Sequence, residues 1–160
     1  MIAHDIYAET NPAWGAWVLS SFIRGFSEAG AQGVDLPIAY LALPICLSGD
    51  LLSTFDGTNK KTGLREWVER SPQIQLELGD RLNGSLRIVS EAVRLGCFTN
   101  AVRLDTEGRL LVGSLPLKTD LAKGLSPALA GPVKRADRLG YWMGMAGSTK
   151  TIFDIVGISL

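Results

Sequence analysis

Apolar residues near the start of the chain repeat at helical spacing. From Trp14 to Phe26, large apolar side chains recur at roughly every third or fourth position, which is the pattern of one buried helix face. Asn11 is a favoured N-cap residue and Pro12 suits the first helical position, whereas Gly30 favours a stop. The pattern therefore predicts a helix from Pro12 to Ala29.

The next segment is apolar on almost every side. Pro37 again suits a first helical position, and Ile38 to Leu52 contains few polar side chains, as expected of a buried central helix. Pro44 removes one backbone hydrogen bond within that segment, so we expect the helix to kink or divide there. The polar stretch from Phe55 to Lys61 predicts a loop.

A short helix and a long helix are predicted in the middle of the chain. Thr62 is a candidate cap for a helix that runs to Arg70, and Ser71-Pro72 ends it and starts the next helix. The long helix should end near Gly96. Its apolar face is formed at helical spacing by Leu78, Leu82, Leu86, Val89 and Val93. Its other face carries Arg81, Arg87, Glu91 and Arg94.

The pattern changes after that helix. Apolar residues flank a turn-forming tetrad at 105–108, so residues 101–113 are predicted to form a β-hairpin. Lys118 to Gly131 predicts a looser connection, with room for one short helical turn at Asp120 to Lys123. Two closing helices follow, Val133 to Met145 and Ser148 to Val156; Ser148 caps the second and Gly157 ends it.

These elements predict a mainly α (α+β) protein in which residues 1–160 form a single domain. Three helices followed by a hairpin is the order of a winged helix, and residues 38–113 are the candidate winged-helix-like core. The N- and C-terminal helices would pack around that core. A chain of 160 residues is long enough to bury a substantial hydrophobic interior.

Charges are balanced over the whole chain but not along it. The formal net charge is zero, which argues against binding of nucleic acid through bulk charge. Residues 1–59 carry six acidic residues against Arg24 alone, and from Lys118 onward six basic residues accompany three acidic ones. This asymmetry indicates either two contact surfaces of opposite charge or ordinary solvated surface.

The cysteines and the apolar runs bear on location. Cys46 and Cys97 lie in apolar surroundings and are expected to be small core residues in a reducing compartment. The start of the chain does not look like a signal peptide, because charged residues interrupt it. The longest apolar run, Leu36 to Leu47, is too short to cross a bilayer. We therefore expect a soluble, cytoplasmic protein without a membrane partner.

Groups that could carry catalysis are scarce. His4 is the only histidine, and two distant cysteines with one histidine do not make an ordinary structural zinc site. The glycine-rich stretch from Gly144 to Lys150 follows a predicted helix instead of a strand, so it does not match a phosphate-binding loop. The sequence thus predicts no catalytic residue, no metal site and no cofactor, and a chain that is not an enzyme.

A winged-helix order raises DNA binding as an alternative. Basic residues on the long helix and the hairpin are candidate phosphate contacts: Arg81, Arg87, Arg94, Arg103 and Arg109. Acidic residues stand on the same elements, and the mixed signs favour a protein interface or a solvated face.

Aromatic residues are concentrated in the first predicted helix. Trp14, Trp17, Phe22 and Phe26 are expected to lie mostly in the core. The uncovered part of so wide an apolar face would be an exposed patch for a partner.

Three blocks stand in order along the chain: Glu9 to Trp14 with Phe22 to Phe26; Leu36 to Ile38 with Leu41 to Ile45; and Lys134 to Trp142 with Ala146 to Thr149, Thr151 to Phe153 and Val156 to Ile158. Together they resemble the middle components of bacterial three-component ABC-ATPase systems. Members often carry a histidine soon after Leu-Pro-Ile, where this chain has Cys46-Leu47-Ser48. The positions that carry the resemblance, as structural or partner-binding residues, are Asn11, Pro12, Trp14, Phe22, Gly25, Pro37, Pro44, Gly140, Trp142, Gly147, Thr149, Phe153 and Gly157.

The resemblance implies a non-catalytic adaptor. Such a subunit would link an SMC- or Rad50-like ABC ATPase to an effector in a Lamassu-like system that acts against phage or plasmids. DNA would be reached through the complex. A winged-helix DNA-binding regulator remains the alternative.

Overall fold

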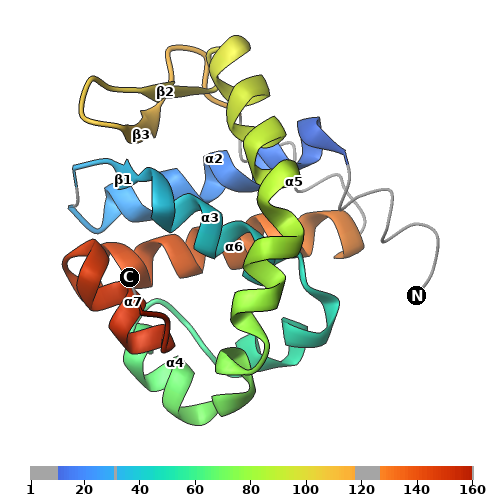
Figure 1. Ribbon diagram of the computed structural model, residues 1–160, viewed down its shortest axis with the longest axis vertical. Helices are drawn as coiled ribbons and strands as arrows, with labels where there is room; N and C mark the ends of the chain where they lie inside the picture. Colours follow the sequence, from blue (N-terminus) through green and yellow to red (C-terminus); the bar gives the residue numbers. More distant parts are fainter. Residues whose placement is uncertain (1–10, 31, 118–126, 160) are drawn as a thin grey trace.

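The computed structural model describes residues 11–30, 32–117 and 127–159, and within 127–129 the backbone alone. Two long helices, α2 (Pro12–Glu28) and α6 (Pro127–Ala146), form the centre of the molecule and make its most extensive contact (Figure 1). Helix α5 (Leu78–Phe98) runs along one side of this pair. A small sheet lies near the C-terminal end of α5, and the short helices α4 (Leu64–Arg70) and α7 (Thr149–Val156) lie toward the opposite end (Figure 1).

Helix α2 confirms the first predicted helix almost to the residue. The side chain of Asn11 accepts hydrogen bonds from the backbone N–H groups of Ala13 at 3.0 Å and Trp14 at 3.4 Å. Pro12 occupies the first turn, where its missing N–H would have no helical partner. The helix ends at Glu28, and Gly30 follows with a positive φ of 89°.

The helix predicted to start at Pro37 and to continue over Ile38–Leu52 is confirmed at its start and wrong at its end. Helix α3 spans Leu36–Leu47, and a 3₁₀ helix, η1 (Gly49–Phe55), continues from it after a 91° bend. Pro44 lies inside α3 and does not divide it. The break comes at Ser48, where the backbone is extended and the helix stops. The Ser48 hydroxyl donates a hydrogen bond to the Pro44 carbonyl at 2.6 Å and so satisfies one of the last helical carbonyls.

Within the described residues, no single helix combines the length and the apolar composition needed to cross a membrane. The bent pair α3 and η1 meets both conditions only when the two are taken together.

The short middle helix α4 begins one residue later than predicted. Its N-cap is Gly63, which has a φ of 80°, and not Thr62. The Thr62 hydroxyl instead accepts a hydrogen bond from the backbone N–H of Asn59 at 3.0 Å and closes the preceding loop. The loop between η1 and α4 confirms the prediction for this polar stretch.

Ser71-Pro72 starts a single 3₁₀ turn and not the long helix itself. This turn, η2 (Pro72–Gln75), is separated from α5 by Leu76 and Glu77, and Glu77 has a φ of 56°. Helix α5 ends at Phe98, two residues beyond Gly96, which confirms the predicted end near Gly96. Gly96 is needed for close packing, because a Cβ there would lie 2.8 Å from Val102.

The apolar stripe predicted for the long helix is only partly buried. Leu78 and Val89 are in the core, but Leu86 is 48% exposed. The buried face runs instead through small residues, Ala92 and Gly96. Ala92 lies against Gly15 of α2 and Gly96 against Val102 of the hairpin, so these small residues allow α5 to pack closely on both elements.

The hairpin is confirmed, and it is part of a larger sheet. Strands β2 (Val102–Leu104) and β3 (Arg109–Val112) pair antiparallel, with Arg103 opposite Leu111. A third strand, β1 (Val34–Asp35), pairs antiparallel with the other edge of β3, so the order is β1-β3-β2. We did not predict β1, because a two-residue strand has no measurable alternation of its own.

The C-terminal helices also depart from the prediction at one end. Helix α6 begins at Pro127 and includes Pro132, so the predicted loose connection is wrong from residue 127 onward. Its first part, with the turn expected at Asp120 to Lys123, lies outside the described residues. Helix α7 confirms the prediction: Ser148 caps it by accepting from the Thr151 N–H at 3.2 Å, and Gly157 ends it with a φ of 82°.

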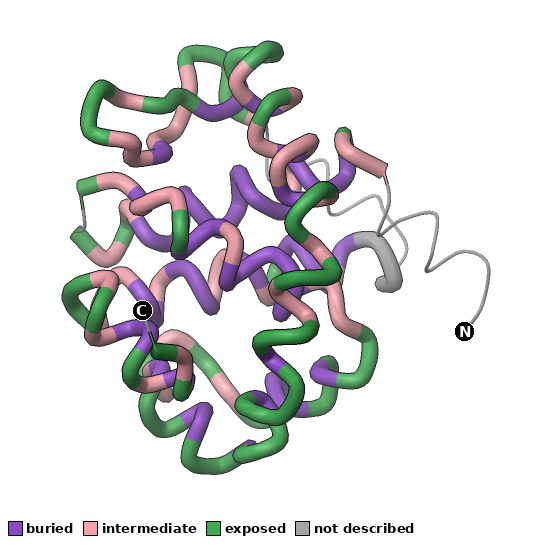
Figure 2. Tube along the Cα trace, in the orientation of Figure 1, coloured by how far each residue is buried: buried purple, intermediate pink, exposed green. Residues whose placement is uncertain are grey.

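One continuous core joins these elements and confirms the mainly helical α+β class. Buried residues line the facing sides of α2, α3 and α6, and only one side of α5 (Figure 2). The predicted aromatic stripe belongs to this core, with Trp14, Phe22 and Phe26 buried and Trp17 partly buried. The large exposed apolar side chains therefore lie outside the stripe: Leu52, Leu76, Leu86, Phe98, Leu104, Leu115 and Met145.

Candidate functional site

Two glycines from the motif blocks set the distance between the central helices. A Cβ on Gly25 would overlap the backbone carbonyl of Asp137, and its next neighbour would be that carbonyl carbon at 2.9 Å. A Cβ on Gly140 would likewise overlap the carbonyl of Phe22. Both helices therefore approach backbone to backbone, and these glycines act in the fold.

Trp142 organises a second buried cluster. Its ring stacks on Phe55 with centroids 5.9 Å apart and lies 5.5 Å from Trp67. The indole N–H of Trp142 donates to the Asn59 carbonyl at 2.9 Å, and that of Trp67 donates to the Thr54 carbonyl at 3.1 Å. The cluster pins η1 and the following loop against α6.

The remaining motif residues also hold elements together. The Thr149 hydroxyl donates to the carboxylate of Asp35, which joins the start of α7 to β1. Phe153 is buried, and Gly147 has a φ of 114° at the corner between α6 and α7. This corner confirms that the Gly144–Lys150 stretch joins two helices. Pro37 stands in the first turn of α3, and Pro44 is buried within that helix.

The uneven charges along the sequence are partly neutralised by folding. Lys60 lies 2.7 Å from Glu28 and 3.6 Å from Asp137, and its hydrogen bond to Glu28 raises its pKa. Two basic residues of the rear half are also used internally. Arg135 donates to the Cys46 carbonyl at 2.9 Å, and Arg138 donates to Thr58 at 2.9 Å. Glu28 of the acidic front is therefore paired with a lysine, whereas the two rear arginines bond uncharged oxygens.

Two of the five candidate phosphate contacts are occupied within the fold. Arg81 donates to the Asp50 carboxylate and, at 3.0 Å, to Ser48 Oγ, and so holds η1 against α5. This hydrogen bond keeps the pKa of Asp50 below its ordinary value. Arg109 is paired with Asp105 at 3.1 Å and with Glu107 across the hairpin turn. These side chains would have to break ion pairs before reaching DNA.

The other three candidates point outward. Arg87 is 85% exposed at its side chain and lies 3.4 Å from Glu91 on the next turn of α5. Arg94 and Arg103 are exposed, and among the described residues no salt bridge involves either one. The outer surface of α5 and the adjoining hairpin is therefore the part of the molecule where predicted contact residues remain accessible.

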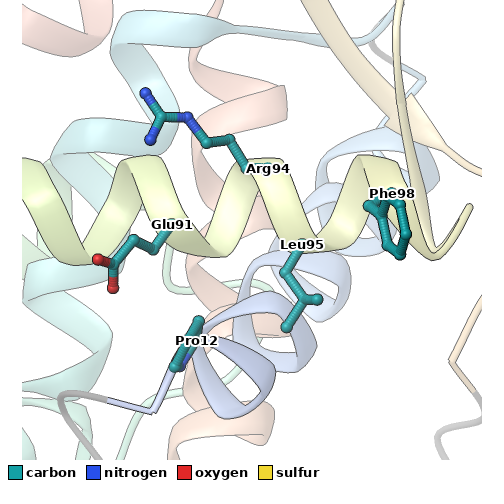
Figure 3. Close-up of a pocket in the computed structure, with 5 residues that line it drawn as sticks. All are labelled: Pro12, Glu91, Arg94, Leu95 and Phe98. Carbon is teal, nitrogen blue, oxygen red and sulfur yellow. The ribbon is translucent and has the colours of Figure 1, made fainter.

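An open groove lies on this surface, between α5 and the first turn of α2. It has a volume of about 430 Å³ and is lined by Pro12, Glu91, Arg94, Leu95 and Phe98. Figure 3 shows Leu95 and Phe98 on the same side of α5 as Pro12, whereas Arg94 leaves the helix on the other side. Phe98 is 86% exposed.

Phe98 and Leu95 were not among the predicted site residues. Phe98 follows Glu91 by seven positions, or two helical turns, so the spacing that places Glu91 on the polar face also places Phe98 there. That signal was present in the sequence. It was missed because an aromatic at the end of an apolar-rich helix is ordinarily a core residue.

Reactive groups are few in the described part of the chain. Burial raises the pKa of the Cys46 thiol to about 12, and burial also raises that of Cys97. Both cysteines are free, and Cys46 is buried as predicted whereas Cys97 is partly exposed. Among the described residues, no three His, Cys, Asp or Glu side chains gather where they could hold a metal ion. His4 lies outside the described residues.

The comparisons with known proteins identify the family. Neither a curated protein nor a solved structure matches this chain. The family model described as "ABC-three component (ABC-3C) system Middle Component 3" matches residues 1–160, over all of the blocks on which the resemblance rests. The chain therefore belongs to the Middle Component 3 family of ABC-three component systems.

Proposed function

We propose that this protein is a non-catalytic adaptor that links an SMC- or Rad50-like ABC ATPase to an effector in a bacterial anti-phage or anti-plasmid system. The observation that carries the proposal is the match of the whole chain to a family of middle components. The proposal assigns it no cofactor and places its complex in the cytoplasm, in keeping with its two free cysteines.

The use of side chains in the fold supports a role in binding. The tryptophans, the motif glycines and several charged residues hold helices and loops together, as described above. The apolar groups that the fold does not use lie on the surface, where they are available to another subunit. The proposal is supported by a continuous buried core that carries exposed apolar side chains.

Coexpression tests the proposal. The chain is produced with the ABC ATPase and the effector encoded beside it, and each pair is purified through a tag on this chain alone. We expect a stable complex with the ATPase that survives gel filtration at micromolar concentration. A monodisperse monomer that ignores both neighbours under these conditions would contradict the proposal.

A winged-helix DNA-binding regulator is the second candidate. The observation in its favour is topological: α3, α5 and the hairpin follow in winged-helix order, and β1 adds a third strand to the sheet. In such a protein α5 would enter the major groove, with Arg87 and Arg94 directed at phosphates and Arg103 on the wing. Glu91 stands between the two helix arginines and disfavours that contact.

Salt dependence distinguishes the two candidates. Binding through several phosphate contacts falls steeply between low and physiological salt. Fluorescence anisotropy with labelled duplex DNA measures this directly. An absence of binding at low salt would remove the regulator, and binding that the Arg87→Ala, Arg94→Ala and Arg103→Ala changes abolish would favour it.

A further inference from the structure

We propose that the outward side of α5 binds the same side of α5 in a second copy of the chain, with the two helices antiparallel. The proposal goes beyond the adaptor function, because it concerns how this subunit pairs with itself. The outer stripe of α5 consists of six positions spaced alternately by four and three residues: Asp80, Gly84, Arg87, Glu91, Arg94 and Phe98. Such spacing is typical of the seam between two paired helices.

The described part of the chain leaves most of the outer stripe uncovered. Five of its six residues are exposed, and Glu91 is partly exposed. The stripe also has two flanks, because successive positions lie alternately to either side of its midline. Figure 3 shows Glu91 and Phe98 on one flank of α5 and Arg94 on the other.

Two features of the outer stripe have no use within one copy of the chain. Phe98 is 86% exposed, although burial of an aromatic ring is favourable. Gly84 lies inside α5, where alanine would favour the helix, and a Cβ there would meet nothing within 4 Å. The fold of one copy therefore does not require a glycine at this position. A bare helix backbone does allow a bulky side chain of a neighbouring molecule to approach closely.

Antiparallel pairing brings these two features together. When the two-fold axis lies level with Val89, Phe98 of one copy lies about one helical turn from Gly84 of the second copy, on the same flank. A helical side chain covers the turn that precedes its own Cα. The ring of Phe98 therefore lies over Gly84 of the second copy, and the same contact recurs at the other end of the helix pair.

The charges of the outer stripe complement themselves in the same register. Arg87 stands level with Glu91 of the second copy, and the two-fold axis repeats this contact. Within each helix Arg87 also lies 3.4 Å from Glu91, so the two copies form a ring of four alternating charges. Arg94 lies one turn from Asp80 of the second copy. Each charged side chain of the stripe thus meets an opposite charge, and this complementarity selects a second copy as the occupant.

Other arrangements of the two helices lose this complementarity. A parallel pair would place each residue beside its own copy, so that Arg87 would face Arg87 and Glu91 would face Glu91. An antiparallel pair with its axis level with Arg87 would also bring the two Arg87 side chains together. Like charges in contact oppose binding. The antiparallel arrangement with its axis level with Val89 is therefore the one we assign.

The length of α5 limits the strength of the pairing. The helix has 21 residues and is about 30 Å long, so one helix pair makes a small interface. We expect a weak, reversible dimer that forms at concentrations between about 10 μM and 1 mM. Because the paired charges are near solvent, its dissociation constant should rise with salt.

Charge reversal tests the register. Sedimentation velocity measures the dissociation constant of the full chain and of each variant. Arg87→Glu alone and Glu91→Arg alone bring like charges together, so each should weaken the dimer by about 10-fold or more. An equimolar mixture of these two variants should associate again, because each glutamate then faces an arginine of the other variant. Energy transfer between differently labelled variants detects that heterodimer.

Further variants separate the apolar contact from folding. Phe98→Ala should weaken the dimer by about 10-fold, as expected for loss of a central aromatic side chain. Gly84→Gln should weaken it similarly by occupying the space of the ring, while the chain unfolds at the same or a higher temperature. Arg65→Glu makes the same change of charge as Arg87→Glu at an exposed position of α4, and should dimerise within about twofold of the unmodified chain.

The remaining outcomes would each overturn the proposal. A chain that stays monomeric over this range of concentration would do so and would leave the adaptor function standing. A dimer that Arg87→Glu, Glu91→Arg and Phe98→Ala leave unchanged would place the interface elsewhere. A mixture of the two charge variants that stays monomeric would exclude the antiparallel register. Binding of the neighbouring ATPase or of duplex DNA to a monomeric chain, abolished by the same changes, would assign the outer stripe to that partner instead.

Discussion

The centre of the molecule and the outer face of α5 use their residues in opposite ways. Between α2 and α6, glycines allow the backbones to touch, and the motif residues of these two helices are buried, apart from Pro12. On the outer face of α5, Phe98 and Arg94 are exposed. The residues that carry the family resemblance thus build the scaffold, whereas the accessible contact face lies largely outside those blocks.

The comparison has a physical basis. A backbone-to-backbone contact tolerates only glycine, so the residue types at a close crossing are narrowly restricted. An exposed binding face accepts many residue types, because water replaces whatever is removed until a partner is present. A motif read from sequence is therefore expected to report the scaffold more faithfully than the partner surface.

The largest effect is expected in the aromatic cluster. Trp142→Ala removes a fully buried ring that stacks on Phe55 and should lower the free energy of unfolding by about 4 kcal/mol. Trp142→Phe keeps most of the packing but loses the hydrogen bond to Asn59, so it should cost about half as much. Urea unfolding followed by fluorescence measures both. If Trp142→Ala were as stable as the unmodified chain, the assignment of Trp142 to the scaffold would be wrong.

The glycine crossing should give the next largest effect. Gly140→Ala places a Cβ against the carbonyl of Phe22 and should destabilise by about 3 kcal/mol. Gly84, in α5, provides the matched control because a Cβ there meets nothing within 4 Å. Gly84→Ala should raise stability by up to about 1 kcal/mol, since alanine favours the helix. Thermal unfolding of the Gly140→Ala and Gly84→Ala variants measures both changes. A Gly140→Ala variant as stable as the unmodified chain would contradict the close approach of α2 and α6.

The Asp50 ion pair gives a smaller, pH-dependent effect. Because the native pKa of Asp50 is lowered by its hydrogen bond with Arg81, the pair adds stability above the unfolded-state pKa and loses it as the pH falls through the native one. Asp50 is 63% exposed, so Asp50→Asn should cost less than about 1 kcal/mol at pH 7. Urea titrations should show this difference vanish as the pH is lowered below about 4. A difference that persists in acid would point to packing instead.

The smallest effect on stability is expected at the groove. Phe98→Ser removes an apolar side chain that is 86% exposed, so the free energy of unfolding should change by less than about 0.5 kcal/mol. Chemical denaturation of the isolated chain measures it. A loss of more than about 2 kcal/mol would place Phe98 in the scaffold and would remove the reason for regarding it as a contact residue.

Residue identity alone determined much of the helical framework. Asn11-Pro12 and Ser148 predict helix starts because their capping depends only on backbone groups a few residues away. The Asp105–Gly108 tetrad predicts its turn for the same reason. The family resemblance could also be recognised from the sequence, because glycines and tryptophans are chemically distinctive. These signals act within a few residues, which is why sequence spacing is sufficient to detect them.

Tertiary structure alone decided the rest. Strand β1 exists because β3, more than seventy residues away, pairs with it, and position 96 of α5 is a glycine because Val102 occupies the space that a side chain would need. Arg81 and Arg94 look alike in sequence, yet Arg81 pairs with Asp50 and Arg94 is exposed. Contacts between distant residues set which charges are paired and which apolar groups are covered, and local spacing carries no information about those contacts.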